Sequence, residues 1–134
     1  MKRTPEEIKE FCLSNIAPYF KDPTICGYNK ATGKIKGKCV YLTKDGKMCV
    51  LGKNLLNPPL NGSEDAAMIF DGNKQEDVLK PEAIGMLNAI QWGLLQSIHD
   101  NIATQQNETI IRAGCEALGI FTYHELVEYT SKLP

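Results

Sequence analysis

The sequence has no long apolar run. No stretch approaches the ~20 consecutive apolar residues that a membrane-spanning helix needs. Residues 1–7, MKRTPEE, also lack the apolar core of a secretory signal peptide. We therefore expect a cytoplasmic protein that does not engage a membrane.

Paired cysteines are also lacking. The five cysteines form no Cys-x-x-Cys motif, and an odd number in a cytoplasmic protein argues against a disulfide framework. The default interpretation is a set of reduced, mostly buried thiols. A zinc site would require Cys26, Cys39, Cys49 and His99 to converge, and their spacing gives no support for that. We expect no metal and no cofactor.

What is present is an ordinary globular composition. The 134 residues are 43% hydrophobic and 23% charged, which excludes the highly charged disordered class. The chain shows no internal repeat and no linker long enough to divide it. It is expected to form one domain over residues 1–134.

Helices are indicated by capping signals and by apolar periodicity. Thr4 and Glu7 form a capping box, and Pro18 is expected to end the helix that they open. A long helix is predicted from near Pro81 to Ile102, where apolar residues recur every three or four positions. Shorter helices are expected over 64–70 and over 107–118, the latter ended by Gly119, with a last one opened by a second capping box at 122–125.

Strands are predicted over 25–29, 34–42 and 47–51, where β-branched and aromatic residues lie between turn signals. Asp45-Gly46 suits a two-residue type I′ turn in which Lys44 faces Lys47, and a bulged turn would shift this register by one residue. The predicted fold class is α+β: a short antiparallel β-meander of two or three strands packed against about four to five helices.

Charge is unevenly distributed along the chain. Residues 21–56 hold eight lysines and two acids, whereas residues 57–134 hold eleven acids and four bases. We expect a non-enzymatic binding protein that engages a nucleotide-like anionic small molecule or an acidic protein surface, and that forms a homo-oligomer. The expected ligand-binding residues are Lys34, Lys36, Lys38, Tyr41, Lys44, Lys47 and Lys53. The alternative is that lysines merely protect exposed sheet edges.

A slightly acidic chain without a recognition motif is not expected to bind duplex DNA.

A cysteine-dependent enzyme is the alternative functional hypothesis. Cys49 or Cys39 would act as nucleophile, with the pKa of its thiol lowered by the imidazole of His99. Asp100 should be poorly placed to orient His99, because neighbours on a helix point roughly 100° apart. A cysteine in a strand is more often a small buried hydrophobe.

Two motifs resemble those of small uncharacterised bacterial and phage proteins. The first is Cys39-x-Tyr41, followed by Asp45-Gly46-x-x-Cys49-x-x-Gly52, and the second is Leu95-Gln96-x-x-His99-Asp100. The resemblance implies a compact domain in the cytoplasm, which for a phage protein is that of the host. It implies no established activity. By class-level analogy such a protein binds a host enzyme as a counter-defence inhibitor, or sequesters a nucleotide signal.

Overall fold

The computed structural model describes residues 2–29, 38–62, 66–104 and 107–134. The part of the chain that the structure describes is mostly helical, with 60% helix and 6% strand. The α+β assignment with a β-meander is therefore wrong. In the described residues, no helix is both long enough and apolar enough to cross a bilayer.

Helices of very different length make up the described part. The α-helices are α1 (Pro5–Lys21), α2 (Ala66–Phe70), α3 (Gln75–Val78), α4 (Ala89–Thr104), α5 (Glu108–Leu118) and α6 (Tyr123–Ser131). Three single 3₁₀ turns are η1 (Pro23–Ile25), η2 (Gly52–Asn54) and η3 (Pro81–Ala83). The strands β1 (Tyr28–Asn29) and β2 (Lys38–Cys39) are two residues each.

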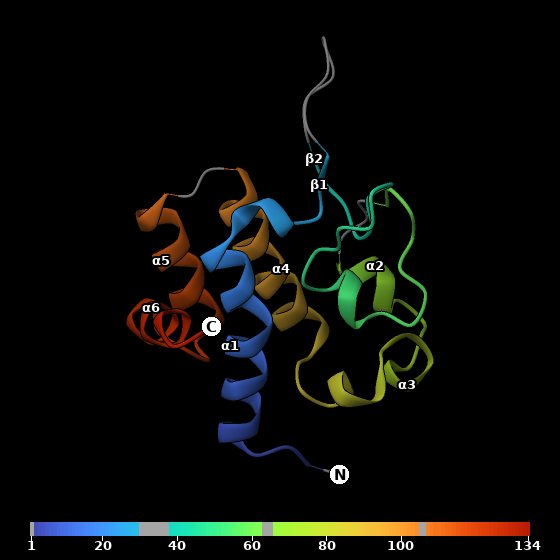
Figure 1. Ribbon diagram of the computed structural model, residues 1–134. Coiled ribbons are helices and arrows are strands. Elements are labelled where there is room, and N and C mark those ends of the chain that lie inside the picture. The colour runs from blue at the N-terminus through green and yellow to red at the C-terminus, as the bar shows by residue number, and fades with distance from the viewer. Residues whose placement is uncertain (1, 30–37, 63–65, 105–106) are drawn as a thin grey trace.

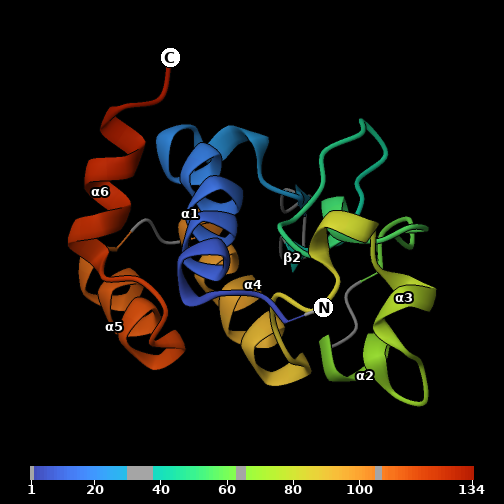
Figure 2. The ribbon, with the colours of Figure 1, turned by 90° about the horizontal axis from the view of Figure 1, so that it is seen from below.

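Helix α4 is the centre of the fold. It packs against α1 and α5 on one side and against α2 on the other, and α6 packs against α1 and α5 (Figures 1 and 2). Trp92, Leu95 and Ile98 of α4 are fully buried, as is Ile16 of α1. Each such side chain contributes roughly 1.5–3 kcal/mol of hydrophobic free energy. Helix packing, and not a sheet, therefore holds the molecule together.

The local helix signals are confirmed at three positions. Thr4 and Thr122 each open a helix through a reciprocal capping box. Gly119 ends α5 with a positive φ of 72°. The prediction for Pro18 is wrong, because α1 continues past it to Lys21. The helix tolerates the lost N–H donor of Pro18 one turn from its end, and the Pro18 carbonyl still accepts a bond from the Asp22 N–H.

The long helix begins later than predicted. The apolar positions from Pro81 onward belong first to η3 and then to a turn in which Gly85 has a φ of 79°. Asn88 and Gln91 then cap α4 reciprocally, each side chain accepting a bond from the backbone N–H of the other residue, at 2.8 and 2.9 Å. The three- and four-residue spacing of the apolar positions therefore does not by itself distinguish a helix from a series of buried turns.

The predicted meander is reduced to fragments. Tyr28 pairs with Cys39, and Asn29 pairs with Lys38, in an antiparallel ladder that joins β1 and β2. The turn at residues 43–47 forms, but it has three residues in its loop: the Thr43 N–H donates to the Lys47 carbonyl over 2.8 Å. Lys44 does not face Lys47, and the register is that of the bulged alternative.

Residues 47–51 do not form the predicted strand. After an isolated bridge between Leu42 and Met48, the chain coils into η2. The Leu51 N–H donates to Gln96 Oε1 over 3.0 Å, and the Gly52 N–H donates to Cys49 Sγ over 3.2 Å. Side chains thus satisfy buried backbone donors that a sheet would otherwise pair. Residues 47–51 are therefore apolar because they are buried, and not because they form a β-strand.

Candidate functional site

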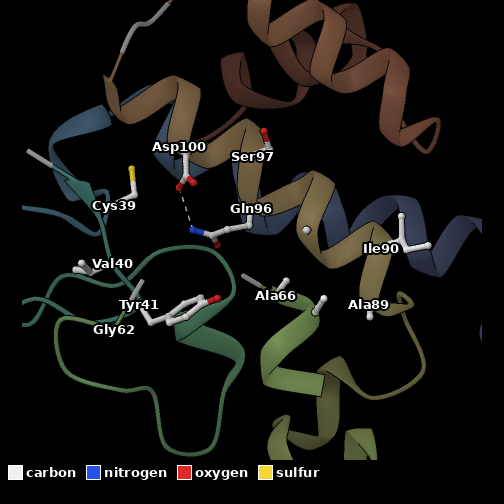
Figure 3. A pocket seen from close by; sticks show the side chains of 12 residues that line it. Cys39, Val40, Tyr41, Gly62, Ala66, Ala89, Ile90, Gln96, Ser97 and Asp100 are labelled. Carbon is white, nitrogen blue, oxygen red and sulfur yellow. Dashed lines mark hydrogen bonds between the residues drawn. The ribbon is translucent and has the colours of Figure 1, made fainter. Parts of the chain in front are cut away.

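A cavity of about 340 Å³ lies between α4, α2 and the segment that follows β2 (Figure 3). Small residues form its walls on the helix side: Ala66 and Ala67 from α2, and Ala89 and Gly93 from α4. The volume falls in the range of small-molecule sites. The cavity is therefore the candidate functional site.

One face of α4 supplies most of the polar groups. Ala89, Gly93, Gln96 and Asp100 follow one another at three- and four-residue intervals, which places them in a row along the helix. Gly93 has no side chain, and a Cβ added there would meet nothing closer than the Ala66 Cβ at 3.9 Å. The space beside Gly93 is therefore part of the cavity.

Asp100 is held by neighbouring side chains. Gln96 Nε2 donates to Asp100 Oδ1 over 3.0 Å, a bond drawn in Figure 3, and His99 Nδ1 lies 2.9 Å from the same oxygen. The Cys39 thiol lies close by, with its sulfur within 4.8 Å of the nearest carboxylate oxygen. The Asp100 side chain is nonetheless 41% exposed. The carboxylate is thus fixed in position while still open to the cavity.

His99 is fully buried, and both of its ring nitrogens are engaged. The Gly27 N–H donates to Nε2 over 3.3 Å, so Nε2 carries no proton. The proton must then lie on Nδ1, which donates it to Asp100. The Tyr19 ring packs edge-on at 4.8 Å between centroids. This arrangement fixes a neutral imidazole in one tautomer. The expectation that Asp100 is poorly placed for His99 is wrong, because the side chains bridge the angle between neighbouring positions.

The two candidate nucleophiles lie in different surroundings. Cys39 is partly buried on the cavity wall, and burial together with the Asp100 carboxylate raises the pKa of its thiol. Cys49 is fully buried, and burial raises the pKa of its thiol to about 12. A reactive cysteine needs a lowered pKa. With neither His99 nitrogen free to take a proton, the geometry does not favour the cysteine-enzyme hypothesis, which stays a prediction.

Three potential metal ligands come together at the same place. One ligand atom each of Cys39, His99 and Asp100 lie within 4.8 Å of one another. A cation on Nδ1 would force the imidazole proton onto Nε2, where it would face the Gly27 N–H. Gly27 is tightly packed, since a Cβ there would lie under 3.0 Å from the Val40 carbonyl oxygen. The hydrogen bonds therefore favour a hydrogen-bonded cluster over a metal centre.

The expected ligand-binding lysines are not gathered at the cavity as far as the described residues go. Lys34 and Lys36 lie outside those residues, and Lys38 is placed only by its backbone in β2. Lys44 is exposed in the turn, and Lys47 Nζ lies 3.8 Å from an Asp45 oxygen. Anion binding by these lysines stays a prediction.

Lys53 and Tyr41 differ from the other predicted ligand-binding residues. The Lys53 ammonium donates to the Asn15 carbonyl over 2.8 Å and lies 4.6 Å from the centre of the Tyr19 ring, at a half-buried position. Tyr41 is buried and lines the cavity, so it is the one expected ligand-binding side chain, among those described, that reaches this site.

The residues of the two motifs lie close together in the fold. Cys39, Tyr41, Gln96 and Asp100 all line the cavity. The sequence analysis missed the small residues that leave the space: Ala66, Ala67, Ala89, Gly93 and Ser97. A signal was present in the four-residue spacing of Ala89, Gly93 and Ser97, but small residues at such spacing are equally typical of helix contacts.

No protein-family model matches the chain, and neither the curated proteins nor the solved structures include a significant match.

Proposed function

We propose that the protein is a small-molecule binding protein whose ligand occupies the cavity between α2, α4 and residues 39–41. The observation that carries the proposal is the Asp100 carboxylate, which Gln96 and His99 hold at the cavity wall while 41% of its side chain stays exposed. Binding sites combine apolar surface with a few fixed polar groups, and here the alanines and Gly93 lie beside Gln96 and Asp100.

Filling the cavity tests the proposal. A leucine at Gly93 projects into the space beside Ala66, whereas a leucine at exposed Ala113 on α5 adds the same side chain away from the cavity. Small soluble fragments are screened by ligand-observed NMR. We expect fragments that bind the wild type and Ala113→Leu, and that lose at least about tenfold in affinity with Gly93→Leu, because the leucine excludes them.

Thermal melts show whether both variants remain folded. Native mass spectrometry of protein isolated from cells offers a second readout, in which a co-purified small molecule disappears with Gly93→Leu only. If every fragment binds Gly93→Leu as well as the wild type, the cavity is not a binding site and the proposal fails.

A further inference from the structure

The Asp100 carboxylate is surrounded by neutral donors. The Gln96 amide is uncharged, and the His99 imidazole is neutral because the Gly27 N–H occupies Nε2. Burial keeps the proton on the Cys39 thiol. Among the side chains that the structure describes, which do not include that of Lys38, no lysine or arginine pairs with Asp100. The negative charge is therefore solvated by dipoles and has no formal counter-charge there.

The rest of the cavity does not offset this charge. Among the lining residues that the structure describes, none is a lysine or arginine, and Asp100 is the one charged residue. Asp100 also lies just before the last turn of α4, which ends at Thr104, and the C-terminal end of a helix carries negative partial charge. A negative potential in a concave site attracts cations and repels phosphates and carboxylates.

The number of open acceptor positions narrows the ligand class further. A carboxylate offers about four lone-pair sites. Gln96 and His99 take two of them, and both use Oδ1. The other oxygen, Oδ2, is therefore the one that these contacts leave to a ligand, which suits a group that binds one oxygen. A guanidinium or amidinium prefers two oxygens side by side, whereas an ammonium acts as a point charge.

From these contacts we infer that the cavity binds a small primary amine in its charged ammonium form, with Asp100 as counter-ion and Gly93 and Ala66 flanking the hydrocarbon part. The inference rests on the proposed function and adds the chemical class of its ligand. The inference differs from the expectation that lysines bind an anionic ligand, since an anion in this cavity would be repelled by the Asp100 carboxylate.

Four single-ring probes of similar size separate the possibilities: benzylamine, benzyl alcohol, benzamidine and benzoate. We expect benzylamine to bind the wild type about tenfold more tightly than neutral benzyl alcohol and at least as tightly as benzamidine. Benzoate should not bind detectably. Benzylamine affinity should fall at high salt, which screens a partly exposed pair, and benzyl alcohol affinity should not.

The variant Asp100→Asn tests the role of the carboxylate directly. It should lower benzylamine affinity about tenfold, to the level of benzyl alcohol, and leave benzyl alcohol binding unchanged. Unchanged benzyl alcohol binding also shows that the variant is folded, and the wild-type comparison across salt needs no variant at all. Lys44→Gln, at an exposed turn position, is the matched charge control and should alter neither probe.

The two proposals fail in different ways. If benzyl alcohol and benzylamine bind equally well, and both are lost in Gly93→Leu, the cavity is a binding site and the ammonium inference is overturned. Preferential binding of benzoate or benzamidine would overturn it as well. If none of the probes binds the wild type, the ammonium inference is rejected, and the fragment screen then decides the proposed function separately.

Discussion

Lys53 shows how one side chain can differ from its neighbours in sequence. Its ammonium lies between the Asn15 carbonyl and the Tyr19 ring, and burial lowers its pKa from 10.5 to about 8. Lysine stems can lie along apolar surface while the charged end stays in water. Here the charged end is half-buried as well and bonds to α1, so the residue supports the packing of η2 on α1.

The lowered pKa of Lys53 predicts a pH-dependent stability. Between about 8 and 10.5 the unfolded chain binds more protons at this residue than the folded one, so the free energy of unfolding rises with pH there. Between about pH 8 and about pH 9, the wild type should gain up to about 1.4 kcal/mol relative to Lys53→Met. Urea denaturation at both pH values measures this.

The control for that measurement is Lys44→Met, which removes an exposed ammonium from the turn at residues 43–47. It shows what replacing an exposed lysine by methionine does to stability at each pH. A difference between the wild type and Lys53→Met that stays constant from pH 7 to pH 9 would contradict the assigned role of the half-buried ammonium.

At the scale of elements, α4 and α5 each contain a glycine, and the two should respond differently to alanine. A Cβ at Gly93 meets Ala66 at 3.9 Å, an ordinary contact, whereas a Cβ at Gly114 lies 3.0 Å from Cγ1 of fully buried Ile98. Gly93→Ala should stabilise the protein by up to about 1 kcal/mol through helix propensity. Gly114→Ala should give no gain or a loss, because overpacking costs roughly 1–3 kcal/mol. Urea denaturation measures the free energy of unfolding of both variants. Equal stabilisation by the two alanines would contradict the close packing of α5 on α4.

The elements that sequence reasoning placed correctly are those with local signals. The capping box at Thr4, the one at Thr122 and the glycine after α5 depend on bonds within four residues, so neighbouring side chains suffice to predict them. Residues 47–51 depend instead on Gln96, which is about 45 positions away and accepts the Leu51 N–H. No local pattern reports such a partner, and the apolar run was therefore taken for a strand.

Sequence reasoning names Cys39 and His99 as candidates and expects Asp100 to be poorly placed beside His99. The structure brings the three side chains together. What the sequence could not supply was the position of Gly27, whose N–H decides the tautomer of His99 and with it the role of the cluster. A glycine inside a predicted strand, here the one over 25–29, carries no sign of this contact. The cavity likewise depends on the packing of α2 near α4, a tertiary contact that no local sequence pattern reports.

At the scale of the whole molecule, the buried thiols set the alkaline limit of stability. Burial raises the pKa of Cys12, Cys26 and Cys49 from 9.0 to about 12, and that of Cys115 to about 11. In the unfolded chain these thiols lose their protons above about pH 9, whereas in the folded protein they keep them. Their stabilising effect is thus complete below pH 9 and is lost as the pH rises toward 12.

Each thiol can lower the free energy of unfolding by up to about 1.4 kcal/mol per pH unit above 9, and the four act in the same direction. Lys53 acts in the opposite direction up to 10.5, but it is one group against four. We therefore expect stability to peak near pH 8 to 9 and to fall steeply by pH 10, measured by urea denaturation under reducing conditions.

Cys115→Ala should be somewhat less stable than the wild type at pH 7, because packing is lost. Its free energy of unfolding should nevertheless fall less steeply above pH 9, since one ionising thiol is removed from the unfolded state. An alkaline slope identical to that of the wild type would mean that the folded and unfolded chains hold this proton equally, and that the thiol is not shielded by α5 and its neighbours.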